Sequence, residues 1–316
     1  MTQEAYLDSS GRDDRLAGGA RMIPIRTPSG TFQVWTKRVG NNPSAKLLLL
    51  HGGPGSTHEY LEAFDSFLPA AGIEYYYYDQ LGSAYSDQPD DDDLWHLPRF
   101  VDELEQVRQA LGLSAENFYL FGHSWGGMLA IEYALQYQQH VKGLIVANMM
   151  AGIPAYNEYA RKLTAELDPE VLAELHELDE RGDLNDPRYR ELLLPNHYAQ
   201  HVLRIADTPE PVLRGGRRSN RHIYVLMQGP SELGARGRIE GWDRMADLSR
   251  ITVPALVIGA THDTMDPEHM RWMAEQFPAG RYLHCPDGSH LALYDDQDVY
   301  MDGLVGFVRD VERGLL

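Results

Sequence analysis

The sequence predicts an α/β protein with a mostly parallel central sheet, helices on both faces of that sheet and an inserted helical region. Short apolar runs such as residues 47–50 show no alternation, which is typical of parallel strands buried on both faces. Segments between these runs place apolar residues three and four positions apart, the spacing of amphipathic helices. From about residue 152 the helical patterns continue without a buried strand until about residue 243.

The first half of the chain alternates strands and helices. Two apolar runs, residues 22–25 and 32–35, flank a Thr27–Gly30 turn and predict a hairpin. Strands are then predicted at residues 47–50, 73–78, 117–121 and 143–147, and helices at 59–68, 98–111 and 125–138. Strands that alternate with helices in this way favour a doubly wound arrangement.

The second half first loses and then regains this alternation. Helices are predicted at residues 156–167, 169–180 and 189–198, without strands between them. A strand at 255–259, a helix at 267–277, a strand at 282–285 and a helix at 297–311 then complete the sheet. We therefore expect an α/β core made of residues 1–151 and 244–316, with residues 152–243 as a helical cap closing over the site.

The composition excludes several classes of protein and partner. The 316 residues carry 47 acidic and 28 basic side chains, and a net charge of −19 disfavours nucleic acid and anionic membranes as partners. The single cysteine, Cys285, excludes an internal disulfide and cysteine-rich zinc sites, and it fits a reducing compartment. No apolar run approaches the roughly 18 residues of a membrane span, and the N-terminus does not resemble a secretory signal, so cytoplasmic residence is expected.

A candidate nucleophile lies in the segment Gly122-His123-Ser124-Trp125-Gly126. This segment follows a predicted strand and opens a predicted helix. A serine on such a sharp turn exposes its hydroxyl at the end of the sheet, and glycines two positions before and after relieve the crowding. The helix N-terminus also favours negative charge developing near Ser124. We therefore predict Ser124 as the nucleophile of an acyl-transfer reaction.

A serine nucleophile needs a base and a carboxylate that orients the base. Asp263 follows the predicted strand 255–259, and His290 follows the predicted strand 282–285. Both would lie at the carboxyl edge of the sheet, where catalytic groups of open α/β sheets gather. Asp266 and Asp287 are rival carboxylates, and Asp263 is preferred because it lies nearest a strand end.

The glycine-rich segment at residues 51–55, HGGPG, follows a buried strand and predicts an oxyanion site. We expect the amides of Gly53 and Trp125 to bind the oxyanion, and Gly52 to line the substrate site. No Lys-Ser/Thr pair follows these glycines, which disfavours a phosphate site. No metal or cofactor is expected: His197 and His201 have helical spacing, but a third ligand is missing, and a helix surface is the better interpretation.

Six segments together resemble the proline iminopeptidase family of the α/β-hydrolases, which includes related amino-acid amide hydrolases. They are HGGPGSTHEY, YDQLGSAYSD, GHSWGG, MQGPSELGARGRIEGWD, and the pair HDTMDP and GSHLAL, and the likeness runs from about Gly18 to the C-terminus. The resemblance implies an α/β-hydrolase fold. It also implies removal of an N-terminal residue, often proline, from short peptides, amides or arylamides through an acyl-enzyme.

The resemblance also implies how the substrate is held. Glu232, in the segment GPSE, matches a carboxylate that binds the free α-amino group of the substrate. Family peptidases often place a second carboxylate directly after the catalytic aspartate, where this chain has Thr264. Asp266 is a partial replacement or, more simply, the start of the helix at Pro267.

Other side chains have weaker indications. Trp125 and Tyr156 are expected to line the acyl pocket. We interpret the basic cluster at positions 214, 217, 218 and 221 as a solvated or ion-paired loop rather than a site for a substrate carboxylate.

The resulting hypothesis is a serine hydrolase whose partner is a small molecule or short peptide with a free amino group. One alternative keeps the triad but changes the substrate, giving an esterase or amino-acid amidase, and Thr264 motivates it. A remote alternative is a noncatalytic small-ligand receptor on the same scaffold. The sequence does not set the oligomeric state.

Overall fold

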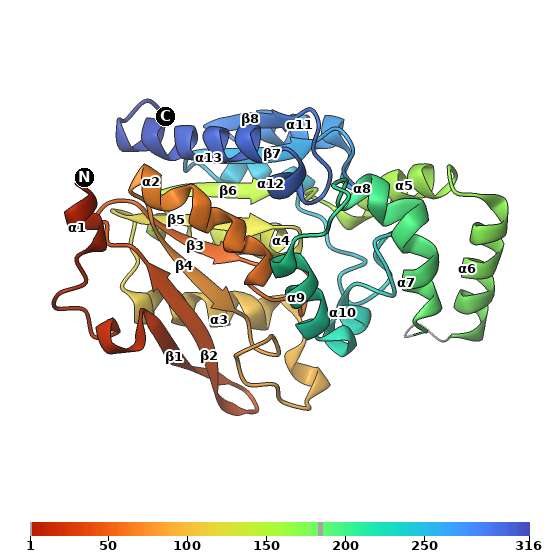
Figure 1. Cartoon of the computed structure of the whole chain (residues 1–316), viewed down its shortest axis with the longest axis horizontal. Helices are drawn as coiled ribbons and strands as arrows, with labels where there is room; N and C mark the ends of the chain where they lie inside the picture. The colour runs from red at the N-terminus through yellow and green to blue at the C-terminus, as the bar shows by residue number, and fades with distance from the viewer. Residues whose placement is uncertain (1, 183–185) are drawn as a thin grey trace.

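The computed structural model describes residues 2–182 and 186–316, and its centre is a single eight-stranded sheet (Figure 1). The strand order is β1-β2-β4-β3-β5-β6-β7-β8. The pairs β1–β2 and β2–β4 are antiparallel, and all later pairs are parallel. The strands are β1 (Ala20–Thr27), β2 (Gly30–Val39), β3 (Lys46–Leu50), β4 (Glu74–Asp79), β5 (Phe118–His123), β6 (Gly143–Ala147), β7 (Ala255–Ala260) and β8 (Gly280–Cys285). The predicted hairpin and every predicted strand are therefore confirmed.

Helices cover both faces of the sheet (Figure 1). One face packs against α3 (Leu97–Leu111), α4 (Trp125–Tyr137) and α11 (Pro267–Gln276). The other face packs against a 3₁₀ helix (Glu59–Ser66), α2 (Leu68–Ala71), α12 (Ala292–Asp295) and α13 (Gln297–Glu312). A short α1 (Gln3–Leu7) precedes the sheet. The predicted helix at 59–68 is thus wrong in type, because most of it forms 3₁₀ turns.

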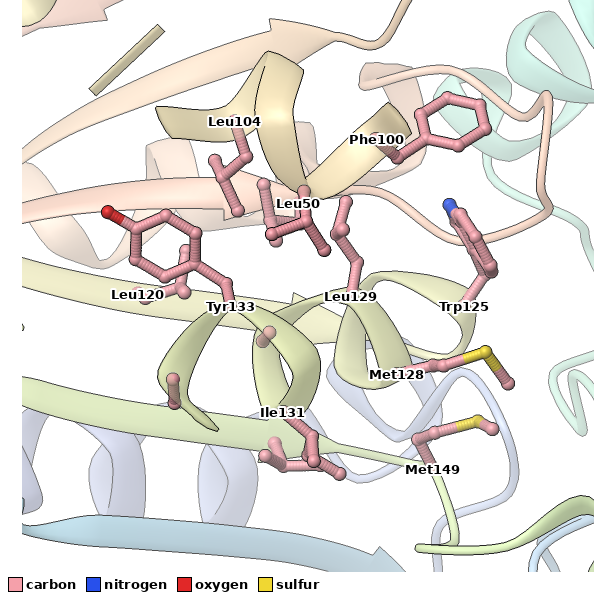
Figure 2. Packing of buried hydrophobic residues seen from close by; sticks show 14 of the residues in the cluster. Leu50, Phe100, Leu104, Leu120, Trp125, Met128, Leu129, Ile131, Tyr133 and Met149 are labelled. Carbon is pink, nitrogen blue, oxygen red and sulfur yellow. The ribbon is translucent and has the colours of Figure 1, made fainter. Parts of the chain in front are cut away.

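The leucines of β3 show why this strand has no polar face. Leu48 and Leu50 point into the core beneath α3 and α4, whereas Leu47 and Leu49 point into the core on the other face. Successive side chains of a strand alternate between faces, so a strand covered on both sides must be apolar throughout. Figure 2 shows Leu50 in the first core, between the side chains of α3 and those of α4. This packing fixes the strand end that leads into the glycine-rich segment.

Between β6 and β7, the described residues 148–182 and 186–254 form six α-helices at one end of the sheet, beyond the carboxyl ends of the parallel strands (Figure 1). They are α5 (Ile153–Thr164), α6 (Pro169–Arg181), α7 (Arg188–Leu193), α8 (Ala199–His201), α9 (Glu210–Arg218) and α10 (Arg221–Met227). We call this segment the helical insertion. The predicted helix at 189–198 divides into α7 and a π-helical turn, Leu194–Tyr198.

The prediction of a loop for the basic cluster is wrong: three of its four arginines lie on α9, and the fourth opens α10. No helix among residues 2–182 and 186–316 is long and apolar enough to cross a membrane.

Candidate active site

Ser124 lies on a sharp turn between β5 and α4. Its backbone has φ 55° and ψ −127°, a region of backbone conformation that residues other than glycine rarely adopt. A Cβ on Gly122 would overlap the carbonyl oxygen of Gly126, and a Cβ on Gly126 would overlap that of Leu50. Both glycines are therefore required for the turn that brings the serine out at the sheet edge.

His290 and Asp263 form a buried pair at the same edge. Nδ1 of His290 lies 2.8 Å from Oδ1 of Asp263, and the aspartate is fully buried. Asp263 follows β7 and His290 follows β8, as predicted. Burial alone would lower the pKa of His290, but the charge of Asp263 and its hydrogen bond outweigh burial and leave this pKa raised.

The two rival carboxylates have other positions. Asp266 is the N-cap of α11, where its side chain accepts a hydrogen bond from the Glu268 amide at 3.0 Å. Asp287 is exposed, and its own amide donates to Asp296. Asp263 is therefore the carboxylate that the fold brings to His290.

A cavity of about 220 Å³ opens over these residues, and its lining includes Ser124, His290, Gly52 and Gly53. The Gly52 amide donates to the Tyr60 hydroxyl at 2.8 Å, so Gly52 contributes wall rather than a donor. Gly53 has φ 113°, a conformation that favours glycine. Trp125 is the first residue of α4, where backbone amides have no partner within the helix.

Glu232 lies where the main cavity meets a second, smaller compartment, and it lines both together with Ser124 and Gly53. Oε1 of Glu232 accepts the Tyr224 hydroxyl at 2.5 Å, and its backbone carbonyl accepts the Tyr156 hydroxyl at 2.8 Å. Among the described residues that line the two compartments, Glu232 is the only carboxylate.

The smaller compartment has mainly apolar walls. Its lining includes Trp125, Tyr156 and the methionines 128, 149 and 265. The Trp125 indole is nearly buried and donates to Oε1 of Gln80 at 2.8 Å, and Figure 2 shows this ring beside Phe100 and Met128. Both aromatic residues therefore line the same compartment as Ser124, and their role in an acyl pocket stays a prediction.

Comparisons with known proteins agree with this geometry. A model of the alpha/beta hydrolase fold family matches residues 46–297. The chain is 55% identical over 293 residues to a proline iminopeptidase of Elizabethkingia meningoseptica, with 92% of this chain and 98% of the relative covered. It is 54% identical to a proline iminopeptidase of Flavobacterium johnsoniae, with the same two coverages. The chain belongs to the proline iminopeptidase family.

Solved structures of similar shape include VinJ, with a TM-score of 0.84, 27% identity, and coverage of 92% of this chain and 99% of that chain. A second is the proline iminopeptidase of Mycobacterium smegmatis, with a TM-score of 0.81, 26% identity, and coverage of 94% and 100%. The predicted α/β-hydrolase fold is confirmed.

Thr264, the residue directly after Asp263, contacts the histidine–aspartate pair. Its hydroxyl lies 3.2 Å from Nδ1 of His290 and 3.4 Å from Oδ1 of Asp263, and the residue is nearly fully buried. The hydroxyl therefore adds a polar partner to the pair.

Two other sequence-based interpretations need comment. His197 is buried rather than on a helix surface, and burial lowers its pKa to about 4. No group of three or more histidine, cysteine or acidic residues positioned for a metal occurs in the described part of the chain. The arginines of α9 are ion-paired as predicted: Arg214 binds Glu62 and Glu210, and Arg218 binds Glu59.

Three polar residues near the proposed triad were not predicted from the sequence. Asn148 follows β6 at the same sheet edge and donates to Oδ2 of Asp263 at 2.7 Å. Tyr60 and His123 contact the glycine-rich segment and the His290 loop. Asn148 could have been predicted, because it directly follows a predicted strand. Tyr60 could not, because its contacts are tertiary and no local pattern shows them.

Proposed function

We propose that this chain is a serine aminopeptidase that removes an N-terminal residue, proline above all, from short peptides, amides or arylamides. The supporting observation is that Glu232 lines the same cavity as Ser124 and His290. A carboxylate in a partly enclosed cavity attracts a substrate ammonium more strongly than an exposed carboxylate does. The names of the relatives support proline as the preferred residue.

In the proposed reaction, Ser124 Oγ attacks the carbonyl carbon of the substrate while His290 accepts the hydroxyl proton. Asp263 holds the imidazole in the correct tautomer and stabilises the imidazolium that forms. The amides of Gly53 and Trp125 stabilise the negative oxygen of the tetrahedral intermediate. His290 then returns the proton to the leaving amine as the C–N bond breaks, which leaves an acyl-enzyme.

Water completes the cycle. His290 accepts a proton from the water as its oxygen attacks the ester carbonyl. The second tetrahedral intermediate collapses, the proton passes to Ser124 Oγ, and the free amino acid leaves. Each step uses only side chains and backbone amides of this chain together with water.

The two compartments suggest where each part of the substrate lies. The N-terminal side chain would lie towards the smaller compartment. That compartment measures only about 10 Å³ in this structure, so an apolar ring would enter it only as the flexible methionines of its wall move aside. The leaving group would occupy the main cavity, whose wall includes Gly215 and Ser219 of the helical insertion. We therefore interpret residues 152–243 as the cap of this enzyme.

A specific observation favours a second candidate. With Glu232 as the only carboxylate among the described lining residues, recognition of the ammonium is weaker than a pair of carboxylates would give. The second candidate is therefore an amidase or esterase that acts on amino-acid amides or esters. It would use the same triad, and it would depend less on binding the substrate ammonium than a peptidase does. Cytoplasmic residence stays a prediction, made from an N-terminus that does not resemble a secretory signal and from apolar runs too short to span a membrane.

The test compares proline p-nitroanilide, prolinamide and a p-nitrophenyl ester of equal size that lacks the amino group. Glu232→Gln should lower kcat/KM roughly 10- to 100-fold on both amino substrates and leave the ester unaffected. Glu240→Gln is the matched control, because this exposed glutamate lies on the same segment. If the ester is the best substrate and Glu232→Gln leaves the amide rates unchanged, amine recognition by Glu232 is wrong.

A further inference from the structure

Two histidines outside the proposed triad hold the backbone of His290. The N–H of His290 donates to the carbonyl oxygen of His201 at 3.0 Å, so the helical insertion holds one side of this residue. The carbonyl oxygen of His290 lies 2.7 Å from Nε2 of His123, which directly precedes Ser124. The His123 and His290 rings lie 5.0 Å apart between centroids. The loop that carries His290 is thus fixed from the Ser124 turn itself.

The other nitrogen of His123 continues this chain of contacts to the glycine-rich segment. Nδ1 of His123 lies 3.0 Å from the hydroxyl of Tyr60, and that hydroxyl accepts the amide of Gly52 at 2.8 Å. Both side chains are nearly fully buried, so water does not compete freely for these bonds. One imidazole therefore connects the loops after β3, β5 and β8.

The hydrogen bonds that link Gly52, Tyr60, His123 and His290 determine which ring nitrogen of His123 carries the proton. A backbone carbonyl only accepts, so Nε2 of His123 must carry the hydrogen that it donates to His290. The Gly52 amide only donates, so the Tyr60 oxygen accepts there and its own hydrogen goes to Nδ1 of His123. His123 is then neutral with its proton on Nε2. Protonation of Nδ1 would force the Tyr60 hydroxyl to turn its hydrogen away from His123, and that hydrogen would lose its acceptor.

The charged surroundings agree with a neutral ring. Tyr60 and His290 contact His123, and Asp263 lies behind His290. Burial, reinforced by the neighbouring His290, lowers the pKa of His123 to about 3. When His290 gains a proton during the reaction, a second cation beside it would oppose that step, and the neutral ring avoids this.

We infer that His123 is a positioning residue, which uses one neutral imidazole to hold the His290 loop and, through Tyr60, the glycine-rich segment in register with Ser124. This inference rests on the proposed function of the three loops. It requires no contact between His123 and the reacting atoms. Displacement of a catalytic group by about 1 Å can cost about 100-fold in rate, so a buried bond at this point has kinetic consequences.

The first test measures the protonation state of the His123 ring by NMR in the wild-type protein. Long-range 1H–15N correlation spectra of the histidine side chains should show His123 as the Nε2–H tautomer, without titration, from pH 5 to pH 8. His290 should titrate in the same spectra. A His123 ring that carries its proton on Nδ1, or that titrates in this range, would overturn the inference without any variant having to fold.

The second test measures the rate at which a fluorophosphonate labels Ser124, alongside the melting temperature. His123→Ala should slow labelling roughly 10- to 100-fold. His123→Gln keeps a donor near Nε2 and should recover most of that loss, and Tyr60→Phe should fall between the two. Tyr300→Phe is the control, since this buried hydroxyl has no hydrogen-bond partner among the described residues.

The outcomes separate this inference from the proposed function. Labelling requires no amino-acid substrate, so a lack of turnover on proline substrates would affect only the proposed function. If His123→Gln is as slow as His123→Ala, or if neither differs from wild type by more than twofold, His123 does not position the site. If the wild type itself is not labelled, the serine mechanism fails and the spectra alone decide the inference.

Discussion

The side-chain amide of Asn148 donates to Oδ2 of Asp263 at 2.7 Å, on the opposite carboxylate oxygen from the one that His290 contacts. Asn148 has φ 52°, so glycine is the substitution that removes the amide without adding backbone strain. Asn148→Gly should lower kcat roughly tenfold or more, because a hydrogen bond to a charged group contributes about 1.5–3 kcal/mol. Steady-state kinetics on proline p-nitroanilide would measure this effect.

A second substitution at the same position provides the contrast. Asn148→Asp tolerates the same backbone but places a carboxylate against Asp263, so its kcat should fall further than that of Asn148→Gly. Equal rates for wild type and Asn148→Gly would show that Asp263 needs no support from this side.

The pH profile depends on the pKa of His290. Only the neutral imidazole accepts the serine proton, and this pKa is raised from the ordinary 6.5, because Asp263 outweighs the effect of burial. The acidic limb of kcat/KM should therefore have its midpoint above pH 6.5. Asp263→Asn should lower kcat steeply and move that limb to lower pH. A wild-type limb below pH 6 would contradict this account.

The raised pKa of His290 also makes the stability of the fold depend on pH, and here low pH is the favourable side. Because the folded state binds the His290 proton more tightly than the unfolded chain, this group stabilises the fold fully below the unfolded pKa. That stabilisation is lost as pH rises through the folded pKa. Thermal unfolding of wild type and His290→Gln at several pH values should show this difference shrinking towards alkaline pH.

The sheet and the three proposed catalytic positions could be predicted from sequence because each depends on local order. Buried strands are apolar throughout, and residues that follow parallel strands must meet at one edge. Ser124, Asp263 and His290 each follow such a strand, and so does Asn148, which the same rule could have found.

Contacts between distant segments could not be read in this way. Tyr60 reaches Gly52 and His123 only after the 3₁₀ helix packs on the sheet. Burial of His197 depends on the tertiary packing of the helical insertion, whereas its helical spacing alone predicted a surface position. Periodicity reports which face of a helix is apolar, not which partner covers a polar residue.

The turn at Ser124 gives a prediction about glycine. Gly126→Ala would place a methyl group against the carbonyl oxygen of Leu50, which costs about 1–3 kcal/mol or displaces the turn. Labelling of Ser124 should slow roughly 100-fold. Gly241→Ala is the matched control, because a methyl group there has no neighbour within 4 Å. Similar losses in both variants would mean that crowding at the turn is not the cause.

Helix α9 is anchored to the core by Arg218, which donates to Oε1 of buried Glu59 at 2.5 Å and lies 4.0 Å over the Tyr85 ring. Gly215, one turn earlier, lines the main cavity. Loss of this anchor should loosen the cavity wall, so Arg218→Gln should raise KM roughly three- to tenfold and change kcat little, because the loss corresponds to about 1 kcal/mol.

The neighbouring Arg217 supplies the matched variant. It is exposed on the same helix and contacts Glu210 at 3.4 Å rather than the core. Arg217→Gln removes the same charge, and its KM should stay within about twofold of wild type because an exposed pair contributes little. Kinetics with a cationic and an uncharged substrate would separate anchoring from charge. If both variants raise KM equally, and only for the cationic substrate, the effect follows the net charge of the protein and the anchor at Glu59 is not its cause.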